Sequence, residues 1–307
     1  MGKFTLHIPQ SRGFPDGMSI LEITEICLFF IFFVVSPPMS PDQQTARVGL
    51  FDSGVGGLSV MREVRRLLPA EDLVYAADSR HVPYGNKSAD FILNRSRRLT
   101  EFLRGKNCKA VVIACNTATV AAAAVLRAEF PGLPIIGMEP AVKPAVAASK
   151  RGIIGVLATV GTLQSAQFAA LLDKFAASVR VVTQPAPGLV ECVEAGALTV
   201  PATRKLAAQF VQPLVAAGVD VIVLGCTHYP FLRPLIQEIV GPDITLIDTG
   251  AAVARQLANR LQENALLRSS SQIGEEKFYT TGSLAATQTA LSVLWPGPAD
   301  LLPVPDS

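Results

Sequence analysis

Short apolar runs alternate with longer amphipathic segments along the chain from residue 46 onward. The runs are rich in β-branched residues and are bounded by polar or small residues, which is typical of buried parallel strands. They predict strands at 47–51, 73–76, 111–115, 134–137, 153–157, 179–183, 221–226 and 244–247. The segments between them predict helices at 58–68, 88–104, 119–130, 163–175 and 199–217, and the polar stretch at 78–87 predicts a loop. This alternation indicates doubly wound α/β domains with right-handed crossovers.

The pattern occurs twice along the chain. The motif Val-Gly-Gly-Leu at 55–58 returns as Val-Gly-Thr-Leu at 160–163, and a cysteine ends a strand both at 115 and at 226. Two halves of similar order would pack with their strand ends facing a common cleft, which is a preferred place for a ligand site. We therefore expect an α/β protein of two pseudo-symmetric doubly wound domains, with mainly parallel sheets and the active site in the cleft between them.

The first 45 residues do not match the rest of the chain. Their apolar run ICLFFIFFVV at 26–35 is too short to span a bilayer, which needs about 20 residues. Met39 is followed by polar residues shortly before the first strand, as an ordinary start would be. Our hypothesis is that residues 1–38 are an upstream over-extension of the reading frame or a disordered leader. A targeting or membrane-associating segment is the alternative.

Composition excludes several classes of function. Lys plus Arg is 27 against 25 for Asp plus Glu, and no basic block occurs, so a nucleic-acid partner is not expected. Five widely spaced cysteines argue against a disulfide framework and favour a reducing compartment, here the cytoplasm. The three histidines have no metal-ligand spacing and no CxxC motif is present, so we expect no metal site.

Cys115 and Cys226 are the strongest candidates for chemistry. Each ends a strand and is followed within two residues by a threonine and by the expected start of a helix. Open α/β sheets bind ligands outside the carboxyl ends of their strands, and a helix N-terminus favours thiolate over thiol. A free thiol has a pKa of about 8.5, so modest lowering would give a usable base near neutral pH. His228 could assist as an acid or base. The alternative is that Cys115 and Cys226 are both small buried residues of the core.

Three mechanisms use a pair of thiols. Redox exchange is disfavoured by the absence of a CxxC motif. Acyl transfer by one cysteine and His228 leaves the second cysteine without a role. Removal of a proton from one face of a carbon and delivery to the other face needs two bases on opposite sides. A pseudo-symmetric pair of domains supplies that geometry.

The loop Asp-Ser-Gly-Val-Gly-Gly at 52–57 follows a strand and opens a helix, but it matches neither a dinucleotide-binding motif nor a P-loop. It can still offer backbone N–H groups to a carboxylate. Asp52 as a simple helix N-cap is the alternative.

Five motifs together resemble bacterial glutamate racemase, of the aspartate/glutamate racemase family. They are FDSGVGGLS at 51–59, PYGNKS at 83–88, ACNTA at 114–118, ATVGT at 158–162 and GCTHYP at 225–230, in the family's order. The resemblance covers 47–250, and FYTTG at 278–282 resembles the family's last strand. It implies a cofactor-independent racemase that interconverts L- and D-glutamate and supplies D-glutamate for peptidoglycan.

The resemblance also implies roles for individual residues. Cys115 would face the α-proton of the D enantiomer and Cys226 that of the L enantiomer. Asp52 would assist Cys115, and His228 would assist Cys226. Glu194 matches the family's further acidic residue by its Val-Glu context. The implied substrate-binding residues are Asp52, Ser53, Pro83, Tyr84, Gly85, Cys115, Asn116, Thr117, Thr162, Cys226 and Thr227.

Glu191 is the alternative to Glu194, because both lie on the short apolar segment 189–194, and either could be a solvated helix charge. The family's fold implies interleaved domains: an extension at 1–45, a domain of 46–137 plus 248–300 with the first cysteine, and a domain of 138–247 with the second. We expect a homodimer that binds glutamate and neither nucleic acid nor membrane.

Two rival functions follow from the same features. Aspartate racemase shares the two-cysteine design, but the Asp-Ser-Gly loop at 52–54 and His228 favour glutamate. A non-catalytic binding module on a racemase-like scaffold is the rival from another class. Retention of both thiols argues against it.

Overall fold

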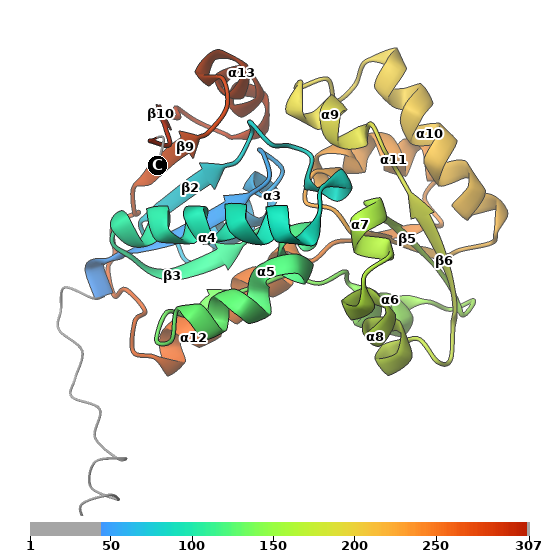
Figure 1. The fold of residues 1–307 in the computed structure, drawn as a ribbon. Coiled ribbons are helices and arrows are strands. Elements are labelled where there is room, and N and C mark those ends of the chain that lie inside the picture. The colour runs from blue at the N-terminus through green and yellow to red at the C-terminus, as the bar shows by residue number, and fades with distance from the viewer. Residues whose placement is uncertain (1–43, 306–307) are drawn as a thin grey trace, which may run out of the picture. The chain divides into compact units, whose positions relative to one another are not determined.

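The computed structural model describes residues 44–305, and the hypothesis about residues 1–38 lies outside them. Within the described residues the strands form two sheets in which every neighbouring pair is parallel (Figure 1). The first sheet has the order β10-β9-β2-β1-β3-β4, and its strands are β1 (Arg47–Asp52), β2 (Leu73–Ala77), β3 (Cys108–Ile113), β4 (Ile135–Ile136), β9 (Glu276–Thr280) and β10 (Leu301–Pro303). The second has the order β6-β5-β7-β8, and its strands are β5 (Ile153–Ala158), β6 (Arg180–Pro185), β7 (Val221–Leu224) and β8 (Thr245–Ile247).

The two sheets repeat one topology. The order β2-β1-β3-β4 in the first sheet is the order β6-β5-β7-β8 in the second, and β9 and β10 extend the first sheet beyond β2. In each sheet the second strand in sequence lies on one side of the first, and the third strand lies on the other side of it. The crevice for a ligand is therefore expected at the carboxyl ends of β1 and β3 and of β5 and β7. The predicted fold class of two doubly wound parallel sheets is confirmed.

Helices cover both faces of the first sheet. Helix α3 (Leu58–Leu67) packs on α12 (Gly250–Glu263), and α4 (Ala89–Gly105) packs on α5 (Asn116–Glu129). In Figure 1, α4 and α5 lie on the side of the first sheet that faces the viewer. Leu50 and Phe51 are successive residues of β1 and belong to two different apolar clusters, because side chains of a strand alternate between its faces. The remaining helices are α6 (Val142–Ala148), α7 (Val160–Leu163), α8 (Ala166–Phe175), α9 (Leu189–Glu194), α10 (Pro201–Ala216), α11 (Arg233–Val240) and α13 (Leu284–Leu294), with short 3-10 helices η1 (Tyr84–Asn86) and η2 (Tyr229–Leu232).

Two helix boundaries differ from the sequence prediction. The helix expected at 163–175 begins only at Ala166, as α8, because the side chain of Ser165 accepts a hydrogen bond from Phe168 N and starts the helix there. Leu163 instead ends the short helix α7. The helix expected from residue 119 begins instead at Asn116, because Sγ of Cys115 accepts from Ala118 N at 3.4 Å. The candidate thiol is therefore itself the N-cap of α5.

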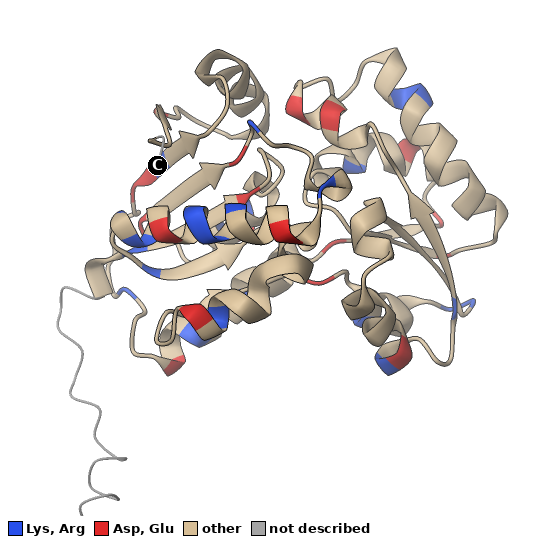
Figure 2. Cartoon of the chain, viewed as in Figure 1, with Lys and Arg blue, Asp and Glu red and all other residues tan. Residues whose placement is uncertain are grey.

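Acidic and basic residues occur side by side on the helices, as α4 shows in Figure 2. No helix between residues 44 and 305 has both the length and the apolar character needed to cross a bilayer.

Candidate active site

The predicted catalytic residues meet at the crevice that the topology defines. Asp52 ends β1, Cys115 follows β3, and Cys226 follows β7. Both cysteines border one small cavity of about 10 Å³, which holds about one water molecule. The cavity is lined by Ser53, Pro83, Tyr84, Gly85, Cys115, Asn116, Thr117, Thr159, Val190, Gly225, Cys226, Thr227 and His228.

Cys115 lies in an environment that favours the neutral thiol. It is buried at the start of α5, and burial raises its pKa well above the ordinary value, as does the negative charge of Asp52. The N–H of Ala118 opposes this rise only in part. At neutral pH the side chain is therefore a proton donor.

The carboxylate of Asp52 is completely buried and is held by hydrogen bonds from two loops. It accepts hydrogen bonds from the N–H groups of Ser53 and Gly57, both at 2.6 Å, and from Oγ1 of Thr227 at 3.0 Å. Burial raises the pKa of Asp52, while the charge of His228 and a hydrogen bond from Cys115 lower it in part. Asp52 thus joins the β1 loop to Thr227 and to Cys115.

In the part of the cavity wall that follows β7, His228 lies between Cys226 and Glu194. Its Nδ1 is 3.7 Å from Sγ of Cys226, and its Nε2 is 2.7 Å from Oε1 of Glu194. Burial alone lowers the pKa of His228, but hydrogen bonds to Cys226 and Glu194 outweigh it and raise the pKa well above the usual value. These contacts favour the protonated imidazole, which has one N–H for each neighbour.

The two glutamates of α9 have different surroundings. Oε1 of Glu194 accepts hydrogen bonds from both His228 and the N–H of Val55, whereas Glu191 is exposed. Their spacing explains why the sequence left the choice open. Residues three positions apart are neighbours on a helix surface, and only the packing of α9 decides which one faces His228.

The glycine loop after β1 binds carboxylates of the protein itself. Its N–H groups at Ser53 and Gly57 go to Asp52, and that of Val55 goes to Glu194. A Cβ atom on Gly56 would overlap the imidazole of His228. Position 56 can therefore lie this close to His228 only as glycine.

The predicted substrate-binding side chains supply polar groups on the cavity wall. Asn116 is buried, and neither its Nδ2 nor its Oδ1 has a hydrogen-bond partner. The hydroxyls of Thr117, Thr159 and Thr162 bond to one another at 3.0–3.3 Å, across the two sheets. Since buried polar groups are normally satisfied, the free amide of Asn116 marks a place for a polar ligand.

The structure brings together every predicted residue, although Asp52, Thr162 and Glu194 stand behind the cavity wall rather than in it. Thr159, Val190 and Gly225 also line the cavity and were missed. Thr159 and Gly225 stand inside motifs already noted, immediately after β5 and β7, so their position at a strand end was an available signal.

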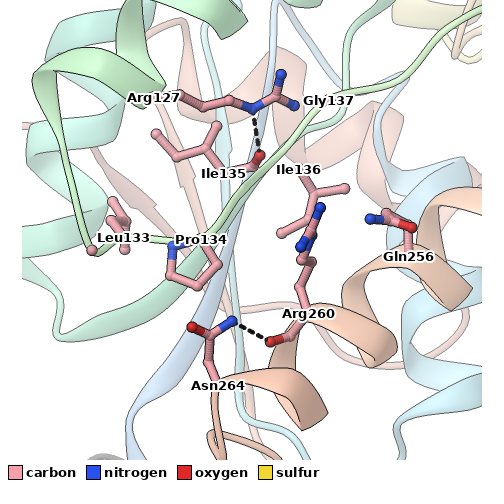
Figure 3. A pocket seen from close by; sticks show the side chains of 10 residues that line it. Arg127, Leu133, Pro134, Ile135, Ile136, Gly137, Gln256, Arg260 and Asn264 are labelled. Carbon is pink, nitrogen blue, oxygen red and sulfur yellow. Dashed lines mark hydrogen bonds between the residues drawn. The ribbon is translucent and has the colours of Figure 1, made fainter. Parts of the chain in front are cut away.

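Nothing in the described part of the chain resembles a metal centre, since residues 44–305 contain no group of three His, Cys, Asp or Glu side chains that could hold an ion. A wider pocket of about 520 Å³ lies near the end of α5 and on α12, and Arg127 and Arg260 border it (Figure 3). None of the predicted site residues lines that pocket.

Comparison with known proteins gives a consistent picture. A family model described as Asp/Glu/Hydantoin racemase matches residues 48–257. The chain is 58% identical over 253 residues to the glutamate racemase of Ectopseudomonas mendocina. The matched residues are 82% of this chain and 96% of the relative.

Solved structures agree with this. The Escherichia coli glutamate racemase in complex with L-glutamate and the activator UDP-MurNAc-Ala is similar at TM-score 0.76 and 32% identity, covering 84% of this chain and 97% of that one. The Francisella tularensis glutamate racemase with D-glutamate is similar at TM-score 0.72 and 27% identity, covering 85% and 98%.

Proposed function

The chain belongs to the Asp/Glu/Hydantoin racemase family, and from this membership we propose that it interconverts L- and D-glutamate without a cofactor. The observation that carries the proposal is that Cys115 and Cys226, at equivalent strand ends of two sheets, line the same cavity. Two thiols on opposite sides of one carbon are what a two-base inversion at that carbon uses. Relatives named glutamate racemase, and structures of such enzymes with L- and D-glutamate, support the choice of substrate.

The reaction begins with removal of the α-proton. In the L-to-D direction, Cys226 as thiolate takes the proton from one face of the α-carbon. Cys115 as thiol then gives its own proton to the opposite face. Cys226 ends protonated and Cys115 ends as thiolate, and proton exchange with solvent restores the starting state. Each thiol acts as base in one direction and as acid in the other.

The environments of the two thiols fit a reaction that starts from L-glutamate, with Cys115 as the proton donor. Burial and Asp52 keep Cys115 in the thiol form, because they raise its pKa. Across the cavity, the cationic His228 has a nitrogen 3.7 Å from Sγ of Cys226, where it can donate a hydrogen bond to a thiolate. Glu194 fixes the ring from behind at 2.7 Å. In the D-to-L direction the same groups act with the roles reversed, so that Cys115 is the thiolate and Cys226 is the thiol.

Substrate carboxylates need hydrogen-bond donors on the cavity wall. The unpartnered amide of Asn116 supports a role as such a donor, and the hydroxyl of Thr117 borders the same cavity. A cavity of about 10 Å³ is smaller than glutamate. Binding therefore requires the segments around it to move apart and close again over the substrate.

D-glutamate produced in this way would supply peptidoglycan synthesis. The proposed location is the cytoplasm, because the four cysteines within residues 44–305 are free thiols and thiols persist in reducing compartments. Restored growth of a D-glutamate-requiring bacterium would support this role. The homodimer stays a prediction that sedimentation analysis would check.

A chiral assay tests the substrate directly. Purified protein should convert L-glutamate to the racemic mixture, and added pyridoxal phosphate should change nothing. Aspartate is the control substrate. Turnover of aspartate but not glutamate would favour an aspartate racemase, and binding of glutamate without turnover would favour a non-catalytic module.

A further inference from the structure

A second buried carboxylate, Asp78, lies next to the active site without lining its cavity. It follows β2 directly, and its backbone N–H donates to the carbonyl of Asp52 at 2.9 Å. Its side chain is completely buried, and it takes no part in the proton transfers proposed above. Its presence therefore needs a separate explanation.

Four side chains converge on this carboxylate. Arg95 of α4 donates through Nε and Nη2, at 2.9 and 2.8 Å, in a two-pronged arrangement. Thr281 donates at 2.8 Å from the end of β9, and Nδ1 of His81 lies 3.1 Å away. The fourth partner, Tyr84, donates its hydroxyl at 2.6 Å. A buried group with this many partners has one favoured orientation.

Tyr84 connects this cluster to the substrate cavity. It is buried in the same apolar cluster as Cys115, and together with Pro83 and Gly85 it forms part of the cavity wall. Burial and the charge of Asp78 raise the pKa of Tyr84, so the hydroxyl keeps its proton and remains a donor.

The segment 82–86 is held from its other side as well. Its helix η1 packs against α7 and α5. A Cβ atom on Gly85 would lie 3.0 Å from Cβ of Thr159, and one on Gly161 would lie 3.2 Å from the carbonyl oxygen of Gly85. The segment is thus fixed between Asp78 on the first sheet and α7 on the second.

We propose that Asp78, clamped by Arg95, is a positioning residue that holds Tyr84 and the segment 82–86 at the wall of the substrate cavity. It acts through Tyr84 and touches no reacting atom. This inference rests on the proposed racemase function, because the substrate whose binding it supports is glutamate. Loosening the segment should weaken substrate binding more than proton transfer, since the thiols stand on other elements.

The test compares Asp78→Asn with a matched control. The amide keeps the shape of the side chain, but only one of its two ends accepts hydrogen bonds. The donors that converge on the other end, from Arg95 and from Tyr84 or Thr281, therefore lose their acceptor. We expect KM for glutamate to rise about 10-fold with kcat within about threefold, the pattern of lost binding. Glu71→Gln is the control, because Glu71 is another buried carboxylate, paired with Lys109 at 2.6 Å and remote from the cavity. Its KM should stay within about twofold of wild type.

A second variant separates positioning from general stability. Tyr84→Phe removes the one hydroxyl bond and should raise KM about threefold or more, and it carries the test if Asp78→Asn fails to fold. The double variant should be no worse than Asp78→Asn by more than about twofold, because both changes break the same link. An additive double variant, or an unchanged KM in both single variants, would overturn the proposal.

Amide hydrogen exchange gives a readout that needs no turnover. Exchange in residues 79–88 should be faster in Asp78→Asn than in wild type and unchanged in Glu71→Gln. If wild-type protein does not racemise glutamate, the proposed function fails. The exchange rates still test whether Asp78 holds Tyr84 in place. If exchange in this segment does not differ between the two variants, the positioning role fails whatever the activity.

Discussion

Nε2 of His228 lies 2.7 Å from Oε1 of Glu194, and the same oxygen accepts the N–H of Val55 at 2.7 Å. This contact links the histidine beside Cys226 to the glycine loop after β1. The loop thereby connects the two sides of the cavity, since its other N–H groups hold Asp52. The hydrogen bonds of Glu194 therefore tie the imidazole to this loop.

Glu194→Gln should lower kcat/KM by roughly 10- to 150-fold, because it removes a hydrogen bond between charged groups that is worth about 1.5–3 kcal/mol. Glu191→Gln is the matched control, three residues away on the same short helix and exposed. Its kinetics should equal those of wild type. Steady-state kinetics in both directions decide the matter, and a larger effect from Glu191 would reverse our assignment of the acidic residue.

Gly56→Ala should damage both stability and activity. The added methyl group would occupy the space of the His228 ring, and overpacking of this kind costs about 1–3 kcal/mol. Gly105→Ala serves as control, since no atom lies within 4 Å of its Cβ position at the end of α4. There we expect unchanged or slightly higher stability, by up to about 1 kcal/mol. Urea unfolding measures both, and equal behaviour of the two variants would contradict the described packing.

The stability that His228 contributes should depend on pH in one direction. Its pKa in the folded protein is raised above the unfolded value of about 6.5, so folding favours the protonated ring. This stabilisation is fully present below about pH 6.5 and is lost as the pH rises through the folded pKa. The difference in unfolding free energy between wild type and His228→Asn should therefore shrink with rising pH. A difference that grows would mean that the ring is neutral in the folded protein.

Cys115→Ser and Cys226→Ser should each abolish racemisation while leaving the fold intact, because a hydroxyl is a far weaker acid than a thiol. General acid–base catalysis typically contributes a factor of about 10² to 10⁴, which sets the smallest loss we expect. Cys192→Ser is the control, since that thiol is half-buried on α9 and does not border the cavity. Circular dichroism checks the fold. Full activity in either active-site variant would remove its thiol from the mechanism.

Local patterns predicted eight of the described strands, because alternation of apolar runs and turns depends on neighbours in sequence. They did not predict the edge strand β10, two of whose three residues are exposed. The repeat of a strand-end cysteine likewise identified Cys115 and Cys226 before any contact was known. The capping of α5 by Cys115 was not predictable, since cysteine is not among the usual N-cap residues. The break at Ser165 was missed because its alanine-rich and leucine-rich surroundings favour one continuous helix.

Contacts between segments that are distant in the chain could not be predicted from the sequence. The stretch 78–87 was predicted only as a polar loop, yet Asp78 meets Thr281 from β9 and Arg95 from α4. The bond from Thr227 to Asp52 joins the two sheets in the same way. Such contacts are set by how the sheets and helices pack, and no local pattern records them.

Deuterium incorporation in heavy water tests the central claim most directly. The reaction is started separately from each enantiomer of glutamate and stopped early, and label at the α-carbon is measured in both enantiomers. Two opposed thiols predict that the product carries deuterium while the recovered substrate stays unlabelled, in both directions. Label appearing in the recovered substrate as fast as in the product would contradict the two-thiol account, because it would mean that a single base exchanges its proton with solvent and serves both faces.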